Sequence, residues 1–123
     1  MRLLLASQSD EPFIVSAQRS HYEALLKSGV KVYEWPGKML HAKTATVDGV
    51  WSTVSTSNLD WWSIVRDNEL NAIILSHSFA GQMELMFNND LENCRQIKLE
   101  QWEQRGLKER LEETAVRAFE PLL

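Results

Sequence analysis

The chain has 123 residues, of which 44% are hydrophobic and 24% are charged, a composition typical of a globular protein with one hydrophobic core. Its formal net charge of −4 argues against the nucleic-acid-binding classes. The single Cys94 excludes an internal disulfide, and no apolar run approaches the roughly 20 residues needed to span a bilayer.

The N-terminal part of the sequence predicts a strand, a helix and a second strand. Residues 2–6 form a short apolar run that is typical of a buried strand. A helix should begin at the Ser-Asp-Glu-Pro segment 9–12, which supplies a cap, a first-turn acid and a proline, and should end at Gly29. Residues 30–35 then predict a second strand.

The segment 41–49 predicts one strand of a β-hairpin and its turn. Asp48 and Gly49 lie between two apolar segments, and Asp-Gly in that position is a strong hairpin signal. Side chains alternate between the two faces of an extended segment. His41 and Lys43 should therefore point into one site, a few ångströms apart.

An imidazole and an ammonium on one face suit the chemistry of phosphate esters. Histidine can act as a nucleophile or base when neutral and as an acid when protonated. Lysine can neutralise the charge of phosphate oxygens. A lone H-x-K pair is nevertheless more often part of an ordinary exposed hairpin, so the residues that follow it must decide between the two interpretations.

Two further pairs of polar residues follow with the same spacing. Thr56 and Asn58 come after the second hairpin strand and offer a hydroxyl and an amide. Glu69 and Asn71 open the next apolar run. A carboxylate such as Glu69 could hold the imidazole through its second nitrogen and so fix its tautomer and orientation.

The C-terminal part predicts a strand followed by helices. The run 70–75 is nearly all apolar, as expected of a central strand covered on both faces. The period then becomes helical, with a core-facing stripe at Phe79, Met83, Met86 and Phe87. Residues 88–90 should break or bend this helix. A last helix is expected after Gly106, packed on the domain or lying on a membrane surface.

Together these features resemble the phospholipase D superfamily. The pattern H-x-K-x-x-x-x-D-G from His41 to Gly49, the small-residue segment ending at Asn58, and Glu69 at the start of a strand carry the resemblance. The run 40–62 is similar to the C-terminal half of bacterial cardiolipin synthases, and the resemblance covers nearly the whole chain. It implies an α/β fold, a mixed β-sheet flanked by helices.

No repeat or linker divides the sequence, so residues 1–123 are expected to form a single catalytic half-domain. The resemblance implies a catalytic set of His41, Lys43, Asp48, Asn58 and Glu69. It implies a substrate-binding set of Lys43, Thr56, Asn58 and Trp61. It implies neither a metal ligand nor a cofactor.

Each residue inherits a role from the resemblance. His41 would be the nucleophile or the general acid, and Glu69 would orient its ring. Lys43 and Asn58 would hold the phosphoryl oxygens, assisted by the hydroxyl of Thr56. These roles describe transfer of a phosphoryl group through a covalent phosphohistidine.

The remaining residues of the site carry open alternatives. Asp48 would stabilise the hairpin and nearby basic groups. Trp61 would line the site entrance or contact a lipid, or it would simply cap the core. The family usually has Gly-Ser where this chain has Ser55 and Thr56, which keeps one hydroxyl but adds a side chain where bare backbone is usual.

Proteins of this family build their active centre from two H-x-K motifs, whereas this sequence contains one. The resemblance therefore implies a partner, either an N-terminal half missing from this chain or a second copy of it. The expected activity is transfer of a phosphatidyl group from one phosphatidylglycerol to another, as in cardiolipin synthases. The alternatives are a homodimeric phosphodiesterase or nuclease of the same superfamily and an inactive truncated half.

The resemblance also carries an expectation about location. The full-length protein should associate with the inner, cytoplasmic membrane, where its phospholipid substrate lies. This fragment is expected to be soluble, and any membrane contact of its own to be peripheral.

Overall fold

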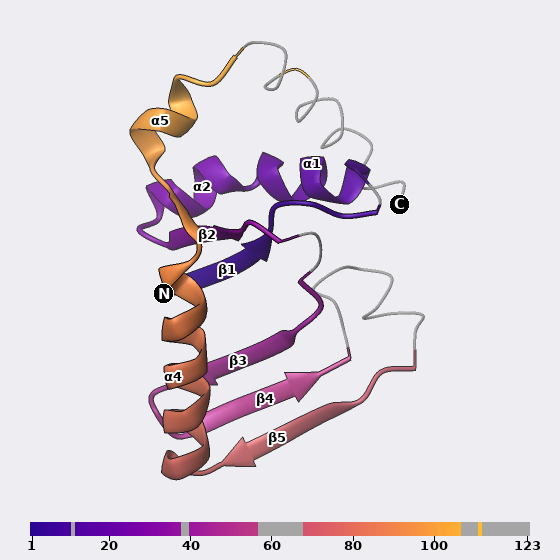
Figure 1. Ribbon diagram of the computed structural model, residues 1–123, viewed down its shortest axis with the longest axis vertical. Helices are drawn as coiled ribbons and strands as arrows, with labels where there is room; N and C mark the ends of the chain where they lie inside the picture. The colour runs from indigo at the N-terminus through magenta and orange to yellow at the C-terminus, as the bar shows by residue number, and fades with distance from the viewer. Residues whose placement is uncertain (11, 38–39, 57–67, 107–110, 112–123) are drawn as a thin grey trace. The chain divides into compact units, whose positions relative to one another are not determined.

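The computed structural model describes residues 1–10, 12–37, 40–56, 68–106 and 111. The chain divides into a first unit, Met1–Leu40 with Asn93–Leu123, and a second unit, His41–Glu92. Each unit contains a three-stranded sheet, with three described helices in the first unit and one in the second (Figure 1). This mixed content confirms the predicted α/β class. None of the helices in the described ranges has the length and apolar character that crossing a membrane requires.

The first unit is built on a mixed sheet of order β1-β2-β6. Its strands are β1 (Arg2–Ala6), β2 (Lys31–Trp35) and β6 (Arg95–Ile97). Its helices are α1 (Pro12–Ser20), α2 (Tyr22–Lys27) and α5 (Leu99–Glu103). β1 runs parallel to β2, and β6 runs antiparallel to it, so β2 is the central strand of the described sheet. The two strands predicted in the N-terminal part are confirmed.

The helix predicted from residue 12 is divided into α1 and α2. The break lies at His21, whose N–H donates to the carbonyl oxygen of Gln18 at 3.3 Å in a tighter turn than that of an α-helix. The predicted end at Gly29 is confirmed. Gly29 has a φ of +83°, a conformation that glycine adopts without strain, and its N–H donates to the oxygen of Leu26 at 3.0 Å.

The core of the first unit joins α2, α5 and the sheet. Tyr22 and Val32 are fully buried, and Ile97 and Trp102 are nearly so. The rings of Tyr22 and Trp102 lie with their centroids 5.0 Å apart. The short helices α2 and α5 thus depend on this aromatic and aliphatic packing, because helices of this length are not stable alone.

A buried carboxylate lies beside this core, and sequence reasoning did not find it. Glu34 on β2 is 1% exposed. Its two oxygens accept from Arg19 Nε at 2.9 Å and from Arg95 Nη2 at 2.6 Å, which connects α1 to β2 and β6. The hydroxyl of Tyr22 also donates to Glu34, and Gln18 Nε2 donates to Tyr22 at 2.7 Å. Charge pairing and hydrogen bonds together make this burial tolerable.

The second unit is an antiparallel sheet of order β3-β4-β5 with one long helix beside it. Its elements are β3 (Lys43–Val47), β4 (Trp51–Ser55), β5 (Asn71–Leu75) and α4 (His77–Glu92). The predicted hairpin is confirmed. Asp48 and Gly49 have φ values of +53° and +62°, the positive angles that a type I′ turn requires.

Two expectations for the second unit are wrong. β5 lies at an edge of the described sheet rather than in its centre, and its Ile73 and Leu75 are 63% and 74% exposed. An apolar run thus indicated a strand but not its position in the sheet. The helix α4 continues through residues 88–90 to Glu92, because polar side chains are tolerated on its solvent face. Within the predicted stripe of this helix, Met86 is exposed and the other three residues are half-buried.

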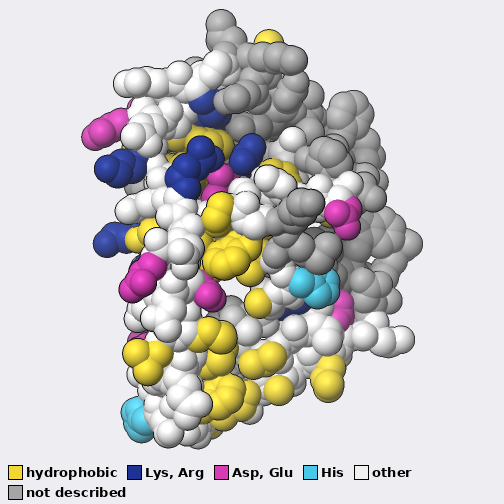
Figure 2. All heavy atoms as spheres, in the orientation of Figure 1, with side chains coloured by type: hydrophobic (Ala, Val, Ile, Leu, Met, Phe, Trp, Pro, Cys, Tyr) yellow, Lys and Arg dark blue, Asp and Glu magenta, His cyan; other side chains and the backbone are white. Residues whose placement is uncertain are grey.

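The faces of this sheet differ in burial. On one face Ser52 is fully buried and its cross-strand partners Thr46 and Ile74 are half-buried, which identifies the face that α4 covers (Figure 1). The other face carries Lys43 at one end and apolar residues such as Val47, 49% exposed, at the other. On the side seen in Figure 2, hydrophobic side chains gather over this sheet and α4.

Replacing the buried carboxylate by its amide tests the role of Glu34. We expect Glu34→Gln to lower the free energy of unfolding by about 2 kcal/mol, since it removes two ion pairs while Arg19 and Arg95 remain partly hydrated. The matched control is Glu23→Gln, which removes an exposed pair with Lys27 and should lower the free energy of unfolding much less than Glu34→Gln does. Equal effects in urea denaturation would contradict a special role for Glu34.

The pH dependence of stability tests the environment of Tyr22. Burial, and then the negative charge of Glu34, raise the pKa of Tyr22 above its ordinary value of 10.0. The contribution of the protonated Tyr22 hydroxyl to stability is therefore complete below pH 10.0. It is lost as the pH rises above that value, because the tyrosine of the unfolded chain releases its proton first. We expect unfolding free energies above about pH 10 to fall more steeply for the wild type than for Tyr22→Phe, by up to about 1.4 kcal/mol per pH unit. Parallel pH profiles would show that Tyr22 titrates normally.

Candidate functional site

The candidate site lies at the end of the second unit's sheet where β3 and β5 begin and β4 ends (Figure 1). Both strand pairings are antiparallel, so the starts of β3 and β5 lie at the same end. Lys43 is paired with Ser55, and Ser55 with Asn71. Directly opposed residues point to the same face of a sheet. These three side chains therefore form a polar row across the end of the sheet.

His41 and Lys43 are in contact, as the sequence predicted. Lys43 Nζ lies 3.1 Å from His41 Nδ1 and 3.4 Å from Nε2, and it donates to the carbonyl oxygen of His41 at 3.1 Å. His41 is exposed, and Lys43 is half-buried at the start of β3. The pair thus presents an imidazole and an ammonium together at the end of the sheet.

Thr56 and Glu69 are also brought together at this end of the sheet. The Thr56 hydroxyl donates to Glu69 Oε2 and accepts from the Leu70 N–H at 3.0 Å. The Thr56 N–H donates to the Leu70 carbonyl oxygen at 3.1 Å, which extends the pairing of β4 with β5. The hydroxyl therefore fixes the position of the carboxylate.

The expected contact of Glu69 with His41 is not among the hydrogen bonds of the described residues. The carboxylate is bonded to Thr56 instead. Both Glu69 and His41 precede their strands by two residues at the same end of the sheet, on either side of the end of β4. The role of Glu69 in orienting the imidazole stays a prediction, as does a substrate contact of Thr56.

Asp48 lies apart from the other described candidates. It occupies the hairpin turn at the opposite end of β3, about 16 Å along the strand from Lys43 at a rise of about 3.3 Å per residue. The turn is closed by a hydrogen bond from the Val50 N–H to the Val47 oxygen at 3.2 Å. This placement agrees with the hairpin role that the resemblance implied for Asp48, and its place in the catalytic set stays a prediction.

Two predicted residues, Asn58 and Trp61, lie outside the described residues, so their roles stay predictions. The structure also shows a contact between Ser55 and Asn71 that the sequence analysis missed. Ser55 Oγ donates to Asn71 Oδ1, next to Lys43 in the polar row. The spacing of Asn71 from Glu69 was visible in the sequence, but its neighbours depend on the pairing of β4 with β5, which are far apart in the chain.

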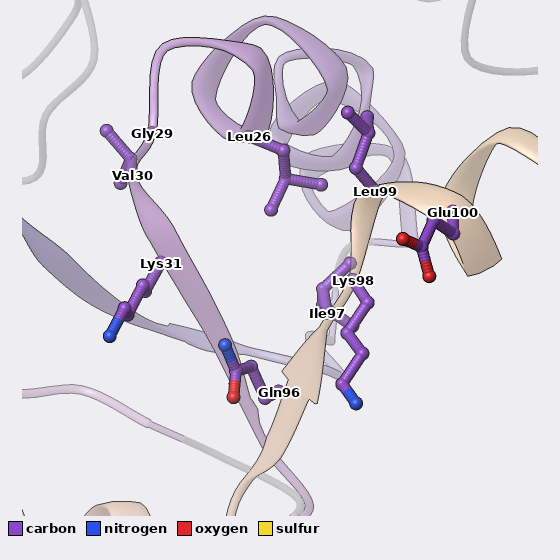
Figure 3. Close-up of a pocket in the computed structure, with 9 residues that line it drawn as sticks. All are labelled: Leu26, Gly29, Val30, Lys31, Gln96, Ile97, Lys98, Leu99 and Glu100. Carbon is purple, nitrogen blue, oxygen red and sulfur yellow. The ribbon is translucent and has the colours of Figure 1, made fainter.

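A separate pocket of about 390 Å³ lies in the first unit and contains none of the predicted site residues. It is lined by residues of α2, β2, β6 and α5 and by the segments beside them. In Figure 3, Lys31 and Lys98 extend on either side of Gln96 at its rim. The described residues contain no group of three His, Cys, Asp or Glu side chains placed to hold a metal ion.

Comparisons with known proteins agree with the chemistry of the sheet end. Residues 1–91 match the family model described as "Cardiolipin synthase, PLD-like domain". The whole chain is 32% identical to a cardiolipin synthase of Clostridium perfringens strain SM101, of which it covers 26%. It is 32% identical to cardiolipin synthase 2 of Bacillus anthracis and 34% identical to a cardiolipin synthase of Halalkalibacterium halodurans, and it covers 24% of each.

The chain thus spans about a quarter of the length of these curated relatives. No solved structure matched it. The family model covers both the H-x-K strand and the strand that follows Glu69, the segments from which the sheet end is built. With a match over most of its length, this chain belongs to the family of cardiolipin synthase PLD-like domains.

Proposed function

We propose that this chain supplies one of the two H-x-K motifs of a cardiolipin synthase-like phosphatidyltransferase. The enzyme transfers the phosphatidyl group of one phosphatidylglycerol to a second molecule, with release of glycerol, at the inner membrane. We assign the catalytic roles at the reacting phosphoryl group to His41, Lys43, Asn58 and Glu69. We assign further contacts with the substrate to Thr56 and Trp61. Residues 1–123 act as a catalytic half-domain within this enzyme.

The contact of His41 with Lys43 carries the proposal. A phosphodiester needs a nucleophile or proton carrier at phosphorus and a cation at its anionic oxygens, and here the two groups are 3.1 Å apart at an accessible end of the sheet. Glu69, held by Thr56 at the same end of the sheet, is the carboxylate to which we assign the orientation of the imidazole.

The chemistry divides between two histidines. One neutral imidazole nitrogen attacks phosphorus, the bond from phosphorus to the glycerol oxygen breaks, and the other histidine, as the imidazolium, gives its proton to that oxygen. The second histidine, now neutral, then takes the proton of a hydroxyl on another phosphatidylglycerol. That oxygen attacks phosphorus, the phosphorus–nitrogen bond breaks, and both histidines return to their starting states.

His41 supplies one of these histidines, so a second motif must come from elsewhere. The relatives are about four times longer than this chain, so a longer protein has room for a second motif, which we assign to an N-terminal half. A second copy of the chain would serve the same purpose in a symmetric dimer. Lys43 and its counterpart would then hold the phosphoryl oxygens from both sides.

Lipid transfer by variants of His41 tests this proposal. The purified chain is mixed with phosphatidylglycerol vesicles, alone and together with the N-terminal half of the Clostridium perfringens relative, and cardiolipin is measured. We expect His41→Ala to reduce its formation roughly 10³-fold, because a proton or phosphoryl carrier is lost.

The matched control is His77→Ala at the start of α4, an exposed histidine whose Nδ1 lies 2.9 Å from the Gly49 carbonyl oxygen at the end of the hairpin remote from Lys43, and its activity should stay within about twofold of the wild type. Equal activity of the wild type and His41→Ala would contradict the catalytic assignment. Cleavage of DNA without any lipid transfer would contradict the substrate.

A further inference from the structure

The polar row of Lys43, Ser55 and Asn71 is longer than a phosphoryl group bound at the H-x-K pair. Opposed Cα atoms in antiparallel strands are about 4.5 or 5.5 Å apart in alternation, so Asn71 lies about 10 Å from Lys43 across the sheet end. A phosphoryl group held by Lys43 and His41 is too small to reach that far. A phosphate ester that is held by Lys43 and also contacts Asn71 must therefore do so through a substituent of the phosphate.

The chemistry of Asn71 is fixed by its neighbour. Its Oδ1 accepts a hydrogen bond from the Ser55 hydroxyl, which orients the amide. The NH2 group, with two N–H donors, is consequently turned away from Ser55. Asn71 is exposed and Ser55 is half-buried, so the amide lies at the accessible surface of the row.

An uncharged amide donor at this distance suits a hydroxyl group better than a second anion. Lys43 is the cation within the row, and Ser55 and Asn71 carry no charge that could compensate a further phosphate. A short polyol attached to the phosphorus spans the strand spacing and offers oxygen atoms that accept from an amide. A hydrogen-bond donor of this kind favours ligands that carry the matching hydroxyl over ligands that lack it.

We propose that Ser55 and Asn71 form a subsite for the polyol headgroup of the phosphodiester whose phosphate is held by His41 and Lys43. Asn71 donates to a hydroxyl of the polyol, and Ser55 holds the amide in the orientation that allows it. Both are therefore specificity-determining residues, and the inference rests on the proposed function.

Binding of two soluble phosphodiesters tests the subsite without requiring turnover. Glycerophosphoglycerol carries the polyol, and diethyl phosphate carries none. Dissociation constants are measured by NMR titration of the 123-residue chain, with the backbone amide spectrum as the check of folding. We expect the wild type to bind glycerophosphoglycerol about fivefold more tightly, the effect of one or two hydrogen bonds to an uncharged donor.

The variants assign this preference to residues. Asn71→Ala and Ser55→Gly should bind both compounds equally and keep the wild-type affinity for diethyl phosphate. Thr44→Ala, an exposed change beside Lys43 but on the opposite face, should keep the preference. A preference that survives Asn71→Ala, or an equal loss of affinity for both compounds, would overturn the subsite.

The variant Lys43→Ala distinguishes a failure of the proposed subsite from a failure of the proposed function. If diethyl phosphate binds through Lys43 but no compound is preferred, the subsite alone is wrong. If neither compound binds, or if Lys43→Ala binds diethyl phosphate as the wild type does, the phosphate site is wrong and the subsite falls with it.

Discussion

The register between β3 and β4 determines which residues can act together in this protein. The turn at Asp48 and Gly49, with its two positive φ angles, fixes the register that opposes Lys43 to Ser55. A slip of one residue would turn Lys43 to the face covered by α4 and separate it from the polar row. Asp48 thus supports this register from the far end of the hairpin through its backbone geometry.

The features that were predicted correctly from the sequence depend on short segments of the chain. The Asp-Gly turn, the alternation from His41 to Lys43 and the glycine at the end of α2 each depend on a few neighbouring residues, and each is found in the structure. The features that were not predicted depend on contacts between distant segments. The edge position of β5, the bond between Ser55 and Asn71, and the ion pairs of Glu34 join segments far apart in the chain, which periodicity alone does not reveal.

The two units use polar groups for different purposes. In the first unit the carboxylate of Glu34 is 1% exposed and is neutralised by two arginines, so it stabilises and connects elements. In the second unit the imidazole of His41 and the amide of Asn71 are exposed at the end of a sheet. Side chains that are held in place but left accessible are those that can bind a substrate, and membership of the cardiolipin synthase PLD-like family agrees with this distinction.

The most direct test of the proposed site is a measurement of the strand register in solution. Interstrand backbone NOEs in the labelled chain should connect Lys43 with Ser55, and Ser55 with Asn71, as the pairing of β3, β4 and β5 requires. NOEs that connect Lys43 with Val54 or Thr56 instead would reveal a one-residue slip. The polar row would then not exist, and the site built on it would be wrong.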